Sequence, residues 1–392
     1  MKYIYLYLNL LFFIFQKNLI IHAREPLAEL WDIEDSEIPN FLETEKYLSL
    51  VDRTLKPLLD DINFGETYVY LKENKVYVHT VNMSKIPEII SKPEIRNYSN
   101  SIDFIPANKS LDNLKYSFNE IIRITNQSKS IGMNGLVIMV HPLLNEVAVN
   151  LPSSNITEAI QEFINAIMIY DPKIIYPPNL TASNTKRRID ERGITIKVGF
   201  WAKRKNNQFL VSAGHSFGNF NDTKSKPKVF YYGINDKPLL VGKMEYSTWS
   251  APYDFSLINI KRMDKHLEPS TNIRNGFLSS YPELIIEKNG MPQSSHITHL
   301  CKSGSVSYVT CGYIISFNGA FVNELGDLYT GMIISTTDVV TGDSGGPSFS
   351  FLNLNSVTLN GIILYIKRYN DVSRFTASIP LKMILDKAEI TY

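Results

Sequence analysis

The sequence predicts a two-part chain in which an α+β unit precedes a mainly β unit. Apolar residues at helical spacing stand before residue 189, whereas the later residues form short apolar or alternating runs between turn signals. The polar, basic stretch at residues 184–188 marks the change in composition. A chain of 392 residues that is 44% apolar and 20% charged has the length of two or three domains, and this composition excludes wholesale disorder.

Composition also excludes several classes of function. A formal net charge of +1 argues against a nucleic-acid-binding protein, and two cysteines are too few for a four-cysteine zinc site. The sequence shows no metal-ligand cluster, nucleotide loop or cofactor motif, so we expect neither a metal nor a cofactor.

Residues 1–23 have the pattern of a secretory signal peptide. Met1 and Lys2 precede the apolar run 3–15, and Ala23 is a small residue at a plausible cleavage point. The run is shorter than the roughly 20 residues that span a bilayer, so an uncleaved anchor is the less favoured alternative. We therefore expect a secreted protein without stable membrane insertion. Seven Asn-X-Ser/Thr triplets fit export of a glycoprotein: Asn82, Asn97, Asn108, Asn126, Asn155, Asn179 and Asn221.

Residues 24–188 read as a folded α+β unit rather than a linker. Two strand-turn-strand patterns lie at 67–81 and 135–151, and apolar residues at helical spacing occupy 111–122. Asn155 and Glu158 form a predicted capping pair for a second helix that extends to Ile167. The unit ends at 184–188, where a processing protease would cut after Arg187 or Arg188; a solvated surface loop is the alternative.

Residues 189–392 contain short strands with little helix, which is typical of a β-barrel or sandwich. The first two strands, 193–202 and 208–213, flank a predicted hairpin turn. Further apolar or alternating runs follow at 239–244, 255–260, 306–317, 331–335, 348–352 and 357–366.

Three distant segments of this second unit carry the chemistry. His215 follows the apolar run 209–213, Asp254 opens another apolar strand, and Ser344 stands in the glycine-rich turn 342–346. A histidine can take the proton of a weakly nucleophilic serine, and a carboxylate can orient that histidine. Chain order then discriminates between folds. The turn also fits the nucleophile elbow of α/β-hydrolases, but no histidine follows Ser344, as that fold requires.

With these residues in this order, the stretch 194–392 resembles the bacterial chymotrypsin-like serine proteases of the streptogrisin and alpha-lytic endopeptidase group. The segment 301–312 is similar to a hairpin of that group, and Gly331-Met332-Ile333 is similar to the strand before its nucleophile. The resemblance implies an all-β fold of two six-stranded antiparallel β-barrels with the catalytic site between them, and a terminal helix at 381–387. More faintly, residues 24–188 resemble the pro-segment that helps to fold and inhibits proteases of this group.

The resemblance implies roles for individual residues. His215 would be the general base, Asp254 would orient it and Ser344 would attack the substrate. The N–H groups of Gly342 and Ser344 would form the oxyanion hole. The resemblance also pairs two sets of residues: a disulfide between Cys301 and Cys311, and a structural ion pair between Lys302 and Asp343.

Departures from the group concern disulfides and specificity. Ser216 replaces a cysteine beside the histidine, and Asp338 replaces another. Asp338 either selects basic substrate side chains or is a surface replacement for the lost cysteine. At the expected pocket wall stand Leu364, Tyr365 and Ile366. Ile366 would narrow or plug the pocket, and Leu364 would remove a hydroxyl that usually supports the triad carboxylate.

We therefore expect a secreted serine endopeptidase that is made as a zymogen and is a monomer when mature. Its partners would be polypeptide substrates and its own pro-segment, 24–188. The altered pocket leaves a catalytically weak or inactive binding module as the alternative, and an esterase with the same triad as a third reading.

Overall fold

The computed structural model describes residues 24–128, 132–177, 198–216, 229–234, 237–275, 280–304, 307–368 and 374–392, with the side chains of 229–238 and 366–368 left out. The predicted signal peptide, the processing site at 184–188, and Asn179 and Asn221 therefore lie outside the described residues. None of the helices in the described ranges has the length and apolar character needed to span a membrane.

The N-terminal half of the leader, by which we mean residues 24–177, packs helices on a small sheet. Its three strands have the order β1-β2-β3, and Leu48, Val51 and Leu55 of the long helix α3 bury their side chains against that sheet. The predicted strands at 67–81 are confirmed as β1 and β2, whereas α3 was not predicted. The elements are α2 (Pro26–Trp31), α3 (Ile38–Leu55), β1 (Phe64–Tyr70), β2 (Lys75–Thr80), α4 (Ile86–Ile90), α5 (Pro93–Arg96) and β3 (Ile102–Pro106).

The C-terminal half of the leader packs two helices on a second sheet. Leu114, Phe118 and Phe163 lie in its core, and the helix predicted over 111–122 is confirmed within α6. The predicted cap of the next helix is wrong by two residues. Thr157, not Asn155, accepts the N–H of Ile160 at 3.3 Å. The elements are α6 (Leu111–Ser128), β4 (Val137–His141), β5 (Glu146–Asn150), α7 (Glu158–Ile167) and β6 (Lys173–Ile175).

The second unit, residues 198–392, is mostly β-sheet, as predicted. Its first sheet has five described strands in the order β7-β8-β11-β10-β9. The predicted hairpin turn falls at residues 205–206, where Lys205 has φ 54°. The strands are β7 (Phe200–Arg204), β8 (Asn207–Ser212), β9 (Val229–Ile234), β10 (Lys237–Ser250) and β11 (Tyr253–Asn259).

The second sheet of this unit pairs six strands in a ring. From β14 the pairing passes to β15, β16, β19, β18 and β17, and then returns to β14. Strand β13 extends the sheet from β18, and β12 pairs with β13. The elements are β12 (Asn272–Arg274), β13 (Glu283–Ile286), β14 (His299–Gly304), β15 (Tyr308–Val322), β16 (Leu328–Ser335), β17 (Pro347–Asn353), β18 (Ser356–Arg368), β19 (Arg374–Pro380) and α8 (Leu381–Ala388).

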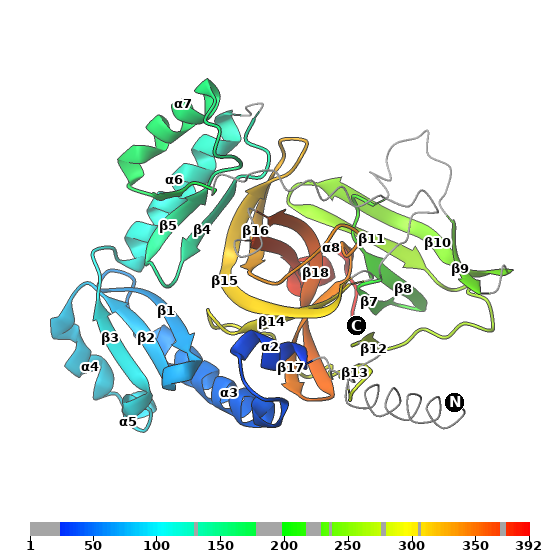
Figure 1. Cartoon of the computed structure of the whole chain (residues 1–392), viewed down its shortest axis with the longest axis horizontal. Coiled ribbons are helices and arrows are strands. Elements are labelled where there is room, and N and C mark those ends of the chain that lie inside the picture. Colours follow the sequence, from blue (N-terminus) through cyan, green and yellow to red (C-terminus); the bar gives the residue numbers. More distant parts are fainter. Residues whose placement is uncertain are drawn as a thin grey trace, which may run out of the picture.

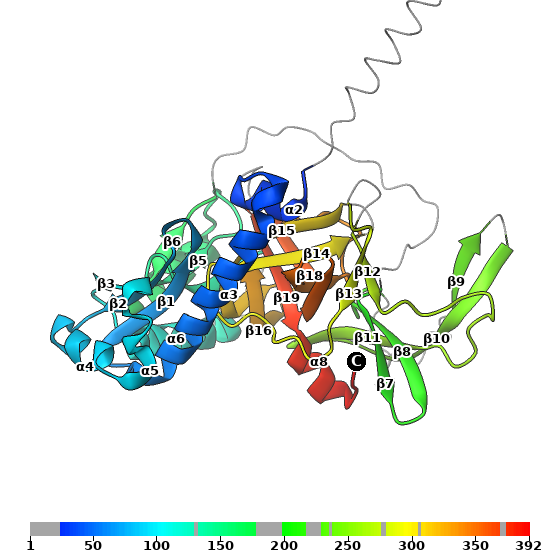
Figure 2. The ribbon, with the colours of Figure 1, turned by 90° about the horizontal axis from the view of Figure 1, so that it is seen from below.

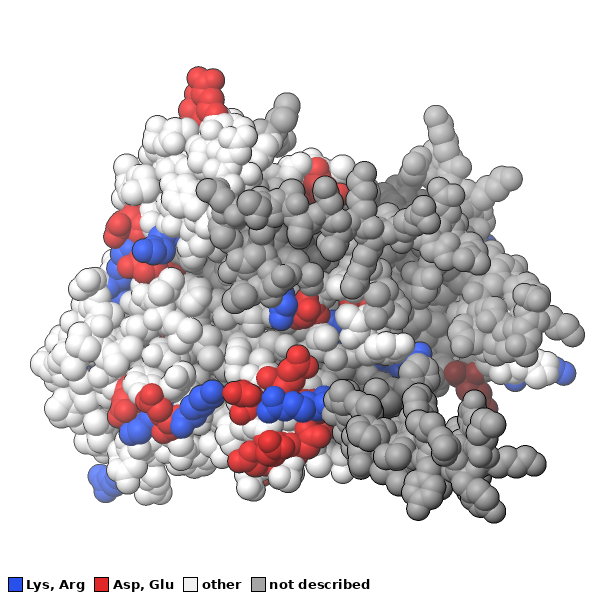
Figure 3. Space-filling view, viewed as in Figure 1, with Lys and Arg blue, Asp and Glu red and all other residues white. Residues whose placement is uncertain are grey.

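The leader joins the second unit through strand pairing and through a shared apolar core, as well as through polar contacts (Figures 1 and 2). Strand β4 pairs antiparallel with β15 through Val137 and Ile138, so the sheet β4-β5-β6 continues the sheet of the second unit. Trp31 and Leu42, from α2 and α3, are 2% exposed and belong to the same apolar core as strands of the second unit. On the face shown in Figure 3, the described acidic and basic side chains are interspersed, with no large area of one sign.

Candidate active site

His215 and Asp254 meet where two neighbouring inner strands of the first sheet, β8 and β11, end and begin. His215 follows the end of β8, and Asp254 lies in β11, which pairs with β8. The carboxylate makes two hydrogen bonds to the histidine: Oδ1 accepts the backbone N–H at 2.8 Å, and Oδ2 lies 2.7 Å from Nδ1. The Asp254 side chain is 6% exposed and that of His215 is 27% exposed. Both the main chain and the ring of His215 are therefore fixed by one buried carboxylate.

Small residues let the chain approach closely beside this pair. A Cβ on Gly214 would lie 1.9 Å from the carbonyl oxygen of Thr248, so only glycine fits there. Ser256 is fully buried two residues after Asp254, and its hydroxyl lies 3.3 Å from the carbonyl of Ala213. These contacts hold β10, β11 and the segment before His215 together.

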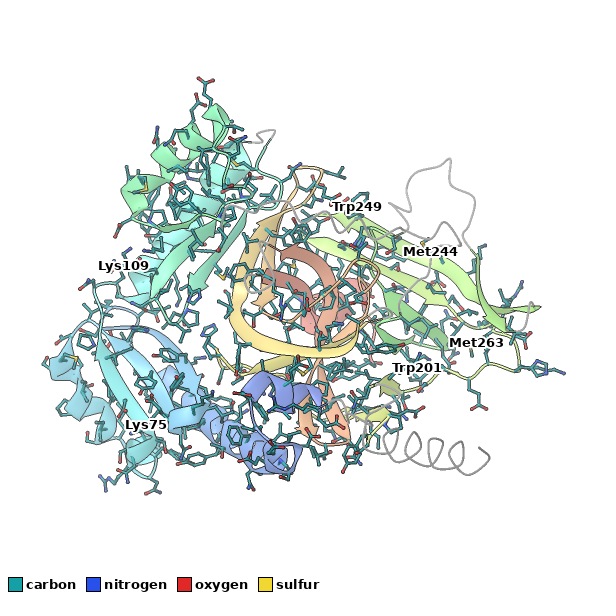
Figure 4. The ribbon with its side chains drawn as sticks, in the orientation of Figure 1. Lys75, Lys109, Trp201, Met244, Trp249 and Met263 are labelled. Atoms are coloured by element: carbon teal, nitrogen blue, oxygen red, sulfur yellow. A yellow bond between two sulfur atoms is a disulfide. The ribbon has the colours of Figure 1, made fainter. Side chains whose placement is uncertain are left out.

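Two residues near His215 were missed by the sequence analysis. The ring of Trp249, on β10, lies 6.5 Å from the imidazole, and it is labelled in Figure 4. Glu324, in the turn between β15 and β16, adds a negative charge. Burial lowers the pKa of His215, but the hydrogen bond and charge of Asp254, with the charge of Glu324, outweigh burial and raise that pKa above its ordinary value.

Ser344 lies between β16 and β17, in a turn of unusual backbone conformation. Gly342 has φ 101° and Gly345 has φ 83°, values that favour glycine. The Ser344 hydroxyl lies 3.5 Å from the carbonyl oxygen of Leu364, and within the described part of the chain it has no hydrogen bond to His215. The N–H of Ser344 has no acceptor among the described residues.

The Leu364 carbonyl is turned toward Ser344 by an irregularity in β18. The register with β19 shifts between Ile363 and Tyr365, so Leu364 stands outside the regular ladder. Such a bulge redirects one residue of a strand. The Leu364 side chain is 5% exposed.

Lys302 and Asp343 form a buried pair beneath the turn of Ser344. Both side chains are 0% exposed, and Nζ lies 3.1 Å from Asp343 Oδ2. The ammonium also donates to the carbonyl of Tyr308 at 2.8 Å and to Ser307 Oγ. Burial lowers the pKa of Lys302, while the charge of Asp343 opposes that shift. These hydrogen bonds give the buried ammonium three oxygen partners, and they hold Asp343, the residue before Ser344, in place.

A disulfide joins Cys301 and Cys311 across the hairpin of β14 and β15, with a Cα–Cα distance of 4.0 Å. Lys302 lies in the loop of chain that this disulfide closes, so the Lys302–Asp343 ion pair is held on a cross-linked hairpin.

Two of the residues predicted to form the specificity pocket, Asp338 and Tyr365, contact different parts of the second unit. Asp338 is partly exposed and pairs with Arg374 Nη1 at 3.4 Å. Tyr365 stacks on Phe321, with ring centroids 4.6 Å apart. The Ile366 side chain lies outside the described residues, so the predicted narrowing of the pocket is untested.

A cavity of about 440 Å³ lies close to the strand that holds Asp254. Ala251 and Pro252 form one part of its wall and the 325–328 turn another, and the leader contributes Thr125, Asn126 and Met133. The leader therefore borders a cavity at the turn that precedes β11, and none of His215, Asp254 and Ser344 lines it.

No protein-family model matches the sequence, and no curated protein sequence matches it either. Solved structures do match half of the chain. Protease A of Thermobifida fusca is 16% identical, with a TM-score of 0.37, over 50% of this chain and 89% of that chain. The Nocardiopsis protease is 15% identical, with a TM-score of 0.38, over 50% and 90%. A glutamic acid-specific serine protease is 17% identical, with a TM-score of 0.39, over 50% and 91%.

Proposed function

We propose that this protein is a secreted serine endopeptidase made as a zymogen, with Ser344 as nucleophile, His215 as general base and Asp254 as the orienting carboxylate. The observation that carries the proposal is the pair of hydrogen bonds from Asp254 to His215. They leave Nε2 of His215 as the ring nitrogen available to a nucleophile. We also propose that the two sheets of the second unit are two barrels: the ring of six strands β14–β19 forms one, and the five-stranded sheet β7–β11 forms the other. The catalytic site would lie between them.

The reaction would proceed through an acyl-enzyme. The Ser344 hydroxyl turns from the Leu364 carbonyl to His215, loses its proton to Nε2, and Oγ bonds to the peptide carbonyl carbon. The N–H groups of Gly342 and Ser344 stabilise the oxyanion. His215 then gives the proton to the leaving amine, and a water activated by His215 hydrolyses the acyl-enzyme, which restores Ser344.

In the zymogen the leader would be both a folding template and an inhibitor. Strand β4 covers the edge of β15, and three leader residues border the cavity beside Ala251 and Pro252. These contacts support the proposal, because they hold the leader on the second unit at the edge of β15 and at the turn that precedes Asp254. The Lys302–Asp343 pair would hold the turn of Ser344 without any newly formed amino terminus.

A fluorophosphonate probe tests the nucleophile. After the leader is removed, the probe should label Ser344 in the wild-type protein and fail to label the Ser344→Ala variant. Peptide-library cleavage by the labelled preparation would separate an endopeptidase from an esterase. Absence of labelling in leader-free, folded protein would contradict the proposal.

A binding module without catalysis is the second candidate. The hydrogen bond from Ser344 to Leu364, rather than to His215, favours it. This candidate predicts that His215→Ala leaves the biological activity intact, whereas the protease proposal predicts its loss.

A further inference from the structure

A buried polar seam joins the leader to residues 291–299 of the second unit. Two acidic residues of α3 enter it, Glu45 at 2% and Asp52 at 0% exposure. Asp52 accepts a hydrogen bond from Ser295 Oγ at 2.6 Å and pairs with Lys56 Nζ at 2.9 Å. The main chains also meet, because the N–H of Val69 donates to the carbonyl of His296 at 3.0 Å. We call this contact the histidine seam, since His141, His296 and His299 lie along it.

The partners of His299 require an uncharged ring. Its Nε2 accepts the backbone N–H of Phe351 at 2.8 Å, so that nitrogen carries no proton. Its Nδ1 donates a hydrogen bond to Glu45 Oε2, and Glu45 Oε1 accepts the backbone N–H of His299 at 2.9 Å. A second proton on the ring would point at the Phe351 N–H. The edge of Trp31 closes the site from α2, and Tyr313 is the other titratable group near Glu45.

His296 is enclosed between the two halves of the leader. Its Nδ1 lies 3.1 Å from the carbonyl oxygen of Thr67 and 3.3 Å from Glu66 Oε2. Asp52 and Lys56 of the α3 end are the other charged groups that act on it, and the ring of Phe317 packs at 5.2 Å.

His141, at the end of β4, is the histidine that acts on His296 from the leader side. Its Nδ1 is buried and has no hydrogen-bond partner among the described residues. A proton added there would bring an uncompensated charge into the contact, next to another imidazole.

We infer that the histidine seam makes docking of the leader acid-sensitive: it accommodates uncharged imidazoles, so that protonation of His141 and His296 on acidification separates the leader from the second unit. This inference goes beyond the proposed function and does not require Ser344 to be a nucleophile.

The direction of the pKa shifts agrees with this inference. Burial lowers the pKa of His296, although Glu66 opposes the shift; burial and the charge of His296 lower the pKa of His141 to about 4. In the separated units, exposed histidines have a pKa near 6.5. Docking is then strongest above about pH 6.5 and weakens as the pH falls toward the lowered values, by up to about tenfold per pH unit for each histidine that gains a proton on release.

The test uses the full chain with Ser344→Ala, so that no self-cleavage occurs. Residues 184–188 are replaced by the recognition site of an added protease, the chain is cut there, and the two fragments are analysed by size exclusion with light scattering. At pH 7.5 the fragments should stay together. At pH 5.0 the dissociation constant should rise by tenfold or more. Equal affinity at both pH values overturns the inference.

Matched variants identify the residues responsible. His141→Gln with His296→Gln should flatten the pH dependence, whereas His266→Gln, which changes a 67% exposed histidine outside the seam, should leave it unchanged. Undiminished pH dependence in the double variant contradicts the inference. If the double variant fails to dock, NMR titration of the histidine ring carbons in the uncut chain decides. Ordinary pKa values for His141 and His296 there would overturn the inference, and lowered values would support it.

Discussion

At His215, charge and burial set the pH range in which the proposed base is uncharged. The hydrogen bond and charge of Asp254, with the charge of Glu324, raise its pKa against the effect of burial. Since the base must be neutral to accept the serine proton, kcat/KM should fall as the pH drops through that raised pKa. Glu324→Gln removes one of these charges. We expect the acid limb of the kcat/KM profile to move to lower pH, with the value at pH 8 unchanged.

The control for Glu324 is Glu287→Gln, which removes an exposed carboxylate of the second unit that is not among the groups shifting the His215 pKa. That variant should keep the wild-type profile. An acid limb that stays in place in Glu324→Gln would show that the charge of this turn does not reach His215.

Asp338 forms an ion pair with Arg374, and this pair concerns the substrate specificity that the sequence predicts. If Asp338 faces the substrate, Arg374→Ala would expose its charge to the substrate side chain. We then expect kcat/KM for peptides with Lys or Arg before the cleaved bond to rise by about tenfold relative to peptides with Ala there, a gain of about 1.4 kcal/mol in transition-state binding. Arg374→Lys, which keeps the charge, is the control. An unchanged preference would leave Asp338 as a surface replacement for cysteine.

The proposed catalytic residues were chosen from the sequence because each lies in a short segment whose residue types suit its chemistry, and their roles stay predictions. Glu324 and Trp249 could not, since neither stands in a recognisable pattern and both reach the site through the folding of distant strands. The pairing of Asp338 with Arg374 was missed for the same reason, because β19 brings the arginine there.

Among the elements, α3 shows why a helix can escape a periodicity argument. One end of its buried face, at Ile38 and Leu42, enters the core of the second unit, and the other end packs on β1 and β2. Glu45 and Asp52 interrupt the apolar face because they belong to the histidine seam. The predicted strands succeeded better, since one apolar run suffices to indicate a buried strand.

The hairpin of β14 and β15 depends on its buried ion pair. Lys302→Met would leave the Asp343 carboxylate buried without its cation, and breaking such a pair costs about 3–5 kcal/mol. In the full chain with Ser344→Ala, urea unfolding should show a clearly lower midpoint. Lys382→Met, which breaks a pair on the exposed face of α8, should leave the midpoint nearly unchanged. Equal midpoints for Lys302→Met and the parent would mean that water replaces the lysine.

On the scale of the whole molecule, the leader contributes to the interior of the second unit. Trp31 and Leu42 share a core with Phe200 and Phe349, and β4 covers an edge of β15. No local pattern predicts these contacts, because they join residues more than 150 positions apart in the chain.

The leader contacts lead to a prediction about folding. Without residues 24–188, the second unit would expose the apolar surface that Trp31 and Leu42 cover and would leave the β15 edge unpaired. Residues 189–392 alone should therefore refold slowly and with low yield, because long-range strand pairing carries a large loop-closure cost. Adding residues 24–188 in trans at pH 7.5 should raise the yield, as measured by near-ultraviolet circular dichroism. A leader carrying Leu42→Asp should give much less rescue, since the charge would enter the shared core. Equal yields with and without the leader would show that the second unit needs no template to fold.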